Sequence, residues 1–334
     1  MKYTIKLKQY GMSILELMVA VTIFMIITVA IFTLYINSNT SYNQDEIAAR
    51  MQENGRFALN MIAKDLIMVN FWGEMLTGST IDTTAFASAG DECGTDLRDT
   101  SEALLYYNYS AGTPMFDPTS CTSVIGTVKS NTNALAIKRV DNSPDTTPYD
   151  NIIYLRTNGF SGALIKNANS VAAPADFNDW AYEPKLYYIR DNANGVPFLC
   201  VAELVNTGYI DSATTTGMTT GVSDIDFATI ASADDCIAEG IQQLHVEFGI
   251  DTDADGVANQ YKSDITASEA GDAVSARIYL LVRASREDAT YTNDKTYNLG
   301  HLATIAAAND NFYRRVYSTT VQLRNPRAYI QLGF

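Results

Sequence analysis

The stretch Gly11-Met12-Ser13-Ile14-Leu15-Glu16-Leu17 decides the fold, because it places one carboxylate at the start of a long apolar run. From Leu17 to Ile36 the chain has no charged residue and no proline. About 20 residues at 1.5 Å per residue give roughly 30 Å of helix, which matches the hydrocarbon core of a bilayer. A charge near the end of such a span costs a few kcal/mol unless it is paired or reaches water. Glu16 therefore needs a partner, and cutting after Gly11 would free the α-amino group of Met12 close by.

The segment before the apolar run predicts how the chain is oriented in the membrane. Residues 1–11 carry Lys2, Lys6 and Lys8 and no acidic residue. Basic residues next to a span stay on the cytoplasmic side, so the remaining residues are expected to cross the membrane. No other part of the chain approaches 18 continuous apolar residues, which predicts a single span followed by one large domain or two small ones.

Composition argues against nucleic-acid binding. The net charge is −15, and a phosphate backbone would be repelled by that field unless a basic patch were present. The densest basic group is Arg314-Arg315 with Arg324 and Arg327, which we interpret as ordinary strand-face residues. We expect no nucleic-acid partner.

Catalytic motifs are also missing from the sequence. There is no GxSxG, no phosphate-binding glycine loop and no HExxH, and the histidines are only His245 and His301. His245 alternates with Leu244 and Val246, which places it on the polar face of a strand. The sequence therefore predicts a protein that is not an enzyme.

The helical pattern continues beyond the apolar run. Up to about Asn70 one amphipathic face is formed by apolar residues at helical spacing, namely Met51, Ala58, Ile62, Leu66 and Val69. Gly55 weakens this helix by about 1 kcal/mol relative to alanine. We therefore divide the chain into a leader (1–11), a transmembrane and amphipathic helix (12–70) and a β-rich head (71–334).

After residue 99 the hydrophobic period changes to two, which indicates strands. Asp191–Gly195 provides a hairpin turn with Asn-Gly where positive φ is needed, and Asn206–Asp224 is typical of a long surface loop. The predicted strands are Ala103–Tyr109, Ala134–Val140, Asn151–Arg156, Lys185–Arg190, Pro197–Leu204, Ile241–Ile250, Ala276–Ala284 and Phe312–Leu323.

Four cysteines lie in the exported part of the chain: Cys93, Cys121, Cys200 and Cys236. They form no CxxC pair, which argues against zinc, and in an oxidising compartment they indicate two disulfides. Three pairings are open. We favour Cys93–Cys121 with Cys200–Cys236, because each closes a moderate loop and would contribute roughly 3 kcal/mol.

Two groups of residues carry a family resemblance. The lysine-rich leader, Gly11-Met12-Ser13-Ile14-Leu15-Glu16-Leu17 and the apolar helix resemble the class III signal of type IV pilins. Gln52-Glu53-Asn54-Gly55-Arg56-Phe57-Ala58-Leu59, together with the segments 276–283 and 314–325, is similar to minor pilins of the PilW type. These are related to J-type minor pseudopilins. Many relatives continue with Gly-Phe-x-Gly-Cys, whereas this chain has Asn70-Phe71-Trp72-Gly73-Glu74 without a cysteine.

The resemblance implies an α+β fold, in which a long N-terminal helix packs on a mainly antiparallel sheet. It also implies cleavage after Gly11 by a prepilin peptidase and N-methylation of Met12. The expected role is a structural minor pilin that primes type IV pilus assembly in a tip complex, with other minor pilins and the major pilin as partners through the helix. The chain would sit in the inner membrane with a periplasmic head and then enter the pilus. The alternatives are a pseudopilin of type II secretion and a tip adhesin with a ligand-binding head.

Within that family, Glu16 is expected to form a salt bridge with the α-amino group of Met12 of a neighbouring subunit. A pair desolvated in lipid would favour one axial register. The alternative is that Glu16 reaches the membrane surface and has no partner.

A candidate calcium site lies at Asp251-Thr252-Asp253-Ala254-Asp255-Gly256-Val257. Three alternating carboxylates followed by glycine match the opening of an EF-hand loop, with the Val257 carbonyl as a further ligand. Lys262 occupies the position of the expected bidentate glutamate, and Asp264 is the nearest substitute. The alternation that precedes the loop places it at the tip of a strand, so the other interpretation is a plain Asx-rich turn.

Overall fold

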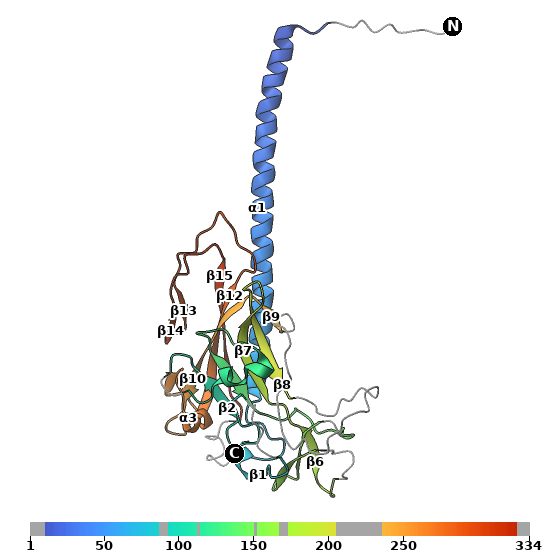
Figure 1. The fold of residues 1–334 in the computed structure, drawn as a ribbon, viewed down its shortest axis with the longest axis vertical. Helices are drawn as coiled ribbons and strands as arrows, with labels where there is room; N and C mark the ends of the chain where they lie inside the picture. The colour runs from blue at the N-terminus through green and yellow to red at the C-terminus, as the bar shows by residue number, and fades with distance from the viewer. Residues whose placement is uncertain are drawn as a thin grey trace, which may run out of the picture. The chain divides into compact units, whose positions relative to one another are not determined.

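The protein is described here from a computed structural model that covers residues 11–86, 93–111, 114–149, 152–166, 173–204 and 236–325. The chain divides into two compact units, Met1–Arg50 and Met51–Phe334. Figure 1 shows the single long helix and the strands of the second unit. The two units are described one at a time below.

The first unit consists of the N-terminal part of helix α1 (Ile14–Ile67). Its apolar side chains are exposed along the whole predicted span. The hydroxyl groups within it are satisfied internally: Thr22 donates to the Val19 carbonyl oxygen at 2.8 Å, and Thr28 donates to that of Phe24 at 2.8 Å. A helix that satisfies its own polar groups suits a hydrocarbon environment, so its length and composition would allow it to cross a membrane.

The helix ends slightly earlier than the sequence pattern predicts. It stops at Ile67 instead of continuing to Asn70, which has a left-handed conformation with φ of 60°. Asparagine tolerates this conformation and commonly ends helices. The Asn70 side chain then donates to the Asn325 carbonyl oxygen at 2.7 Å, which ties the helix end to the last described residues.

The second unit begins with the last turns of α1, which pack into the head as predicted. Their buried residues include apolar ones at helical spacing: Met51, Ala58, Leu59, Ile62 and Leu66. Gly55 is also buried, and a Cβ added there would lie 2.8 Å from Cδ2 of the Tyr317 ring. This glycine therefore lowers the helix propensity but allows a strand residue to approach the helix backbone closely.

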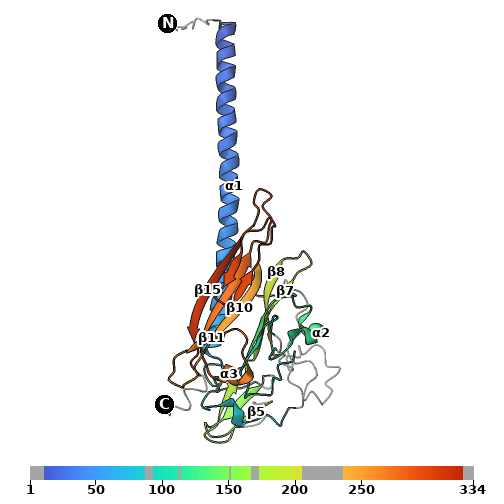
Figure 2. The same ribbon diagram turned by 90° about the vertical axis from the view of Figure 1, so that its left-hand side faces the viewer.

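Two larger sheets form the centre of the head. One has the order β2-β3-β7-β8-β9 and is antiparallel throughout. The other has the order β11-β10-β12-β15 and is also antiparallel. Figure 2 shows them as adjacent layers, and β10 contacts both β7 and β8. The strand bounds are β2 Leu104–Tyr107, β3 Ala134–Ile137, β7 Lys185–Asp191, β8 Pro197–Glu203, β9 Ala238–Glu239, β10 Ile241–Ile250, β11 Gln260–Lys262, β12 Ala273–Arg283 and β15 Arg314–Gln322.

The remaining strands form smaller sheets, and of these strands the sequence pattern predicted only β4. A four-stranded sheet has the order β1-β5-β4-β6, in which only the β1–β5 pair is parallel among the described strands. A separate hairpin pairs β13 with β14. The bounds are β1 Ile81–Asp82, β4 Tyr154–Thr157, β5 Gly162–Ile165, β6 Asn178–Ala181, β13 Tyr297–Leu299 and β14 Ala303–Ile305, and the short helices are η1 Gly78–Thr80, η2 Pro118–Cys121, α2 Thr122–Ile125 and α3 Ala267–Gly271.

The expected α+β class with a mainly antiparallel head is confirmed, although the head contains several sheets instead of one. Each of the eight predicted strands corresponds to an observed strand with shifted ends. The β7–β8 hairpin turns through Gly195, whose φ of 70° is the positive value predicted for that position. The predicted loop 206–224 lies outside the described residues.

Candidate functional site

The start of α1 is the first candidate site. Ser13 precedes the helix, and its hydroxyl oxygen accepts from the Leu15 backbone N–H at 3.4 Å. Glu16 completes the arrangement, because its Oε2 accepts from the Ser13 backbone N–H at 3.1 Å. These two bonds satisfy backbone donors that a helix start leaves free, in an arrangement close to a capping box except that the serine accepts from the second helical residue and not the third. The carboxylate is therefore held near the helix start, four residues after Met12 in the sequence.

The second site element is the exposed apolar surface that follows Glu16. Leu17, Phe24 and Ile31 are each more than half exposed, at 55%, 69% and 60%. A continuous apolar surface of this kind is covered by lipid or by other apolar helices. From Glu16 to Ile36 the first unit thus presents one acid followed by an uninterrupted apolar helix surface.

The C-terminal end of α1 contributes to a buried ion cluster that the sequence analysis did not predict. Asp65 is buried, and its Oδ1 lies 2.9 Å from Nη2 of Arg139. Its Oδ2 accepts a hydrogen bond from the Tyr187 hydroxyl and lies 3.4 Å from Nζ of Lys185. Arg139 also pairs with Glu183 at 2.7 Å. The cluster links the helix to two sheet-forming segments, and the signal for it was an aspartate on the apolar face of the helix.

Burial and a neighbouring charge keep the Tyr187 hydroxyl of this cluster protonated. Burial, followed by the charge of Asp65, raises the pKa of the Tyr187 hydroxyl. That hydroxyl therefore stays protonated and donates to the carboxylate. Because the Asp65 carboxylate is buried among several donors, removing any one donor is expected to lower the stability of the head.

The residue before Gly55 also contacts a strand. The Asn54 side chain donates to the Glu239 carbonyl oxygen at 3.0 Å, while Arg56 and Phe57 remain exposed. The segment that resembles PilW-type minor pilins thus joins the helix to the strand region on one side.

Both disulfides of the favoured pairing are present, Cys93–Cys121 and Cys200–Cys236. The first joins the residues after the 87–92 segment to the end of η2. The second joins β8 to the residue pair that precedes β9. All four cysteines are therefore paired, as expected for a chain with an exported head.

The acidic loop follows β10 and leads into β11, so its position at a strand tip is as predicted. Carboxylate oxygens of Asp251, Asp253 and Asp255 lie within 4.8 Å of one another. Asp264 was also predicted as a ligand, but among the described residues the group of close carboxylates does not include it. Lys262 instead pairs with Glu269, which forms the capping box of α3.

The Asx-turn interpretation also applies to this loop. Asp251 Oδ1 accepts from the Ala254 backbone N–H at 2.7 Å, and its Oδ2 accepts from that of Gly256 at 2.7 Å. Burial acts to raise the pKa of Asp251, but these backbone donors outweigh it and lower the pKa. The carboxylate is therefore ionised with or without a cation, and calcium binding stays a prediction.

His245 does not lie on a solvated strand face. Its exposed fraction is 3%, because both faces of β10 are buried. The segment that joins β13 to β14 lies against this face: His301 donates its backbone N–H to Glu247 Oε1 at 2.6 Å. Burial lowers the pKa of His245 to about 4, and the charge of Glu247 opposes that shift. The histidine is therefore neutral at neutral pH.

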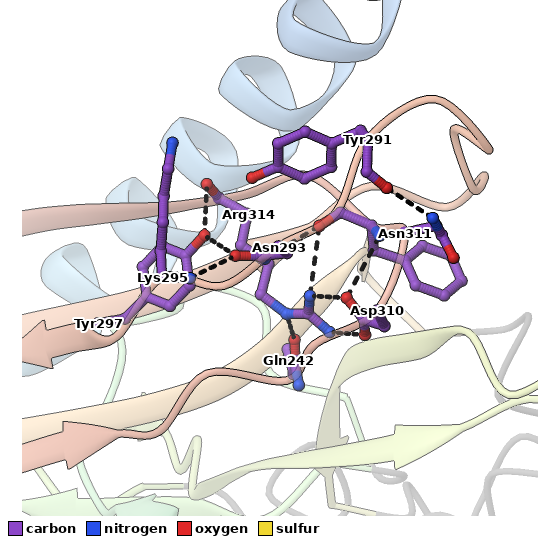
Figure 3. Close-up of polar contacts among 9 residues, drawn as sticks. Gln242, Tyr291, Asn293, Lys295, Tyr297, Asp310, Asn311 and Arg314 are labelled. Atoms are coloured by element: carbon purple, nitrogen blue, oxygen red, sulfur yellow. Dashed lines mark hydrogen bonds and ion pairs between the residues drawn. The ribbon is translucent and has the colours of Figure 1, made fainter.

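Arg314 is also more than an ordinary strand-face residue, as Figure 3 shows. Its guanidinium binds both carboxylate oxygens of Asp310, at 2.5 and 2.6 Å, and donates to Gln242 at 2.7 Å. Asn293 beside it accepts from the Tyr297 hydroxyl at 3.1 Å. These bonds hold the connection between β12 and β15 against the sheet, so the role of Arg314 is to stabilise the fold. Arg327, expected in the same basic group, lies outside the described residues.

Comparisons with known proteins agree with the motifs at both ends of the chain. The prokaryotic N-terminal methylation motif matches residues 6–32, and the family described as type IV pilus-assembly protein W matches residues 186–325. Among curated proteins no match was found. A type IV-like pilin from Thermus thermophilus is similar at 10% identity and a TM-score of 0.36, over 83% of this chain and 98% of that one.

The family assignment rests on the two sequence matches, because a structural likeness at that score does not establish a common fold. The methylation-motif match covers the second half of the leader, Glu16 and most of the apolar run. The second covers the strands from β7 to β15, including the segments whose resemblance was noted from sequence. The chain therefore carries a PilW domain and an N-terminal methylation motif, and in both it is similar to type IV pilus minor pilins of the PilW type.

Proposed function

We propose that this protein is a minor pilin that helps to prime type IV pilus assembly and occupies a complex of minor pilins at the pilus tip. The observation that carries the proposal is a single carboxylate, Glu16, at the start of the exposed apolar run Leu17–Ile36, which has no other charge. An acid in that position is functional by default in membrane proteins. The role is structural, and we assign the chain no catalytic step.

The proposed mechanism begins with removal of residues 1–11 by a prepilin peptidase. This frees the α-amino group of Met12, which is then methylated. Glu16 at first accepts only the Ser13 backbone N–H among the described residues. In an assembling bundle its carboxylate can pair with the Met12 amine of a neighbouring subunit. A wrong axial register would leave both charges unpaired in a low dielectric, so the pair selects one register.

The two units divide the work of assembly in this proposal. The helix anchors the chain in the inner membrane and then packs against the helices of other minor pilins and the major pilin. The head remains in the periplasm until the subunit enters the pilus, and its surface selects the neighbours. Disulfides in the head suit an oxidising compartment of this kind.

The test replaces Glu16 with alanine in a strain that depends on this chain for pili. We expect the Glu16→Ala protein to reach the membrane and to be cleaved normally, while the number of surface pili falls to near that of a deletion strain. The matched control is Glu46→Ala, which removes an exposed acid of the same helix that pairs with Arg50. Normal pilus numbers with Glu16→Ala, or an equal loss with Glu46→Ala, would contradict the proposal.

A further inference from the structure

A polar pocket within the head contains two buried side chains with hydrogen-bonding atoms that have no partner. The pocket has a volume of about 190 Å³, so it has room for a small ligand only, since sites for drug-sized ligands hold about 300–1,000 Å³. Its lining includes Gln243 and His245, whose exposed fractions are 6% and 3%. Gln243 Oε1 and His245 Nε2 are both buried without a hydrogen-bond partner. Such groups cost roughly 1–3 kcal/mol each, so they indicate that something binds there.

The surrounding bonds fix which atom donates and which accepts. Gln243 Nε2 donates to the Asn131 carbonyl oxygen at 2.8 Å, which leaves Oε1 as a free acceptor. Asn133 Oδ1 accepts from the Tyr109 backbone N–H at 3.1 Å, so its amide nitrogen faces His245 Nδ1 at 3.5 Å. An amide nitrogen only donates, so Nδ1 accepts and the ring proton is on Nε2. The pocket therefore offers one acceptor and one donor.

The rest of the lining selects for a neutral ligand. None of the described residues that line the pocket is an Asp, Glu, Lys or Arg. Glu247 is close, with Oε1 4.0 Å from His245 Nε2, but that oxygen already accepts the backbone N–H groups of His301 and Leu302. Apolar side chains from the β13–β14 hairpin line the same space: Leu299, Leu302 and Ile305.

We propose that this pocket binds a neutral sugar residue. A hydroxyl group both donates and accepts, so adjacent hydroxyls of a sugar can satisfy Gln243 Oε1 and His245 Nε2–H together. The C–H faces of the sugar ring can pack on the apolar side chains of the β13–β14 hairpin. The site lies entirely in the head and stands apart from the assembly role of Glu16.

The test titrates the full-length protein, held in a detergent that is not a glycoside, with D-glucose, D-galactose and N-acetyl-D-glucosamine. The charged sugar D-glucuronate serves as the comparison. The readout is the ring nitrogen signals of His245 by NMR. We expect at least one neutral sugar to shift the Nε2 signal in a saturable way, with D-glucuronate at least about tenfold weaker.

A matched pair of variants tests the location of the site. Leu302 lines the pocket with half of its surface exposed, so Leu302→Trp should fill the pocket without disturbing the core. Leu76→Trp makes the same change at an exposed residue outside the pocket lining. Leu302→Trp should abolish the shift and Leu76→Trp should leave it unchanged. The proposal is overturned if no neutral sugar shifts the His245 signals, if D-glucuronate binds equally well, or if Leu302→Trp binds like the parent.

Discussion

Two carboxylates on the same helix, Glu16 and Asp65, are in opposite situations. Asp65 lies in the head and is fully surrounded by Arg139, Lys185 and the Tyr187 hydroxyl. Glu16 lies in the first unit and, among the described residues, accepts one backbone N–H from Ser13. Asp65 thus completes its interactions within the chain, whereas Glu16 keeps capacity for a partner from another molecule. The comparison indicates that the carboxylate in the head is satisfied within the chain, whereas under the proposed function the carboxylate at the helix start is satisfied by assembly.

The largest expected effect is on the stability of the head. Asp65→Asn removes the charge that neutralises Arg139 and should lower the free energy of unfolding by about 3–5 kcal/mol. Urea denaturation of the full chain in detergent, followed by near-ultraviolet circular dichroism, measures this. Glu16→Ala should not change the urea midpoint, because its carboxylate makes no contact in the head. Equal midpoints for Asp65→Asn and the parent would show that the two carboxylates do not differ as described.

Acid should weaken the head through His245. This histidine titrates near pH 6.5 when unfolded and near pH 4 when folded, so below pH 6.5 the unfolded state binds the extra proton. The free energy of unfolding should therefore fall by about 3 kcal/mol between pH 6.5 and pH 4 and then level off for this group.

The variant His245→Gln isolates that contribution from the acidic groups that titrate in the same range. Its urea midpoint should depend less on pH between 6.5 and 4 than that of the parent. Parallel pH profiles of the two proteins would contradict the neutral, buried state of His245.

A smaller effect is expected where the helix meets the sheet. Gly55→Ala improves helix propensity by about 1 kcal/mol, but the new Cβ would lie 2.8 Å from the Tyr317 ring. Overpacking of this kind costs about 1–3 kcal/mol, so we expect a net loss of about 1 kcal/mol in thermal unfolding. Glu53→Ala, an exposed change in the same turn, is the control. A rise in melting temperature with Gly55→Ala would show that the ring moves away freely.

The smallest effect concerns calcium at the β10–β11 loop. If the three gathered carboxylates bind the ion, calorimetry of the full chain should show heat on addition of calcium, and saturation would add about 1 kcal/mol of stability. Asp253→Asn should remove the heat. Asp264→Asn should keep it, because Asp264 lies outside the group. Absence of heat from the parent would leave the loop as an Asx-rich turn.

Local patterns in the sequence predicted the elements of the fold better than its buried polar groups. The apolar run, the strand alternation and the glycine at position 195 are local signals, and each was confirmed. The pairing of the four cysteines followed from loop length. His245 was misplaced because alternation shows that a strand has two faces, but not that residues from the β13–β14 hairpin, far along the chain, cover the second face. Arg314 was misread for the same reason, since Asp310 and Gln242 reach it through the tertiary fold.

Asp65 illustrates what the helical pattern of apolar residues cannot predict. Its position among Ile62 and Leu66 showed a charge on the buried face, but its partners come from Arg139, Lys185 and Tyr187 in separate segments. Helical spacing shows that Asp65 is a charged residue on the apolar face, but it does not show which residues pair with it. The pocket beside His245 depends in the same way on segments that are distant in sequence.

The most direct test of the account is the N-terminus of the mature protein. The full chain should be co-expressed with a prepilin peptidase, purified from membranes and examined by intact mass and N-terminal sequencing. The account predicts a polypeptide that begins with methylated Met12, whose amine is then available to Glu16 of a neighbour. A mature chain that still begins at Met1, or that starts at any other residue, would contradict it, because no such amine would exist.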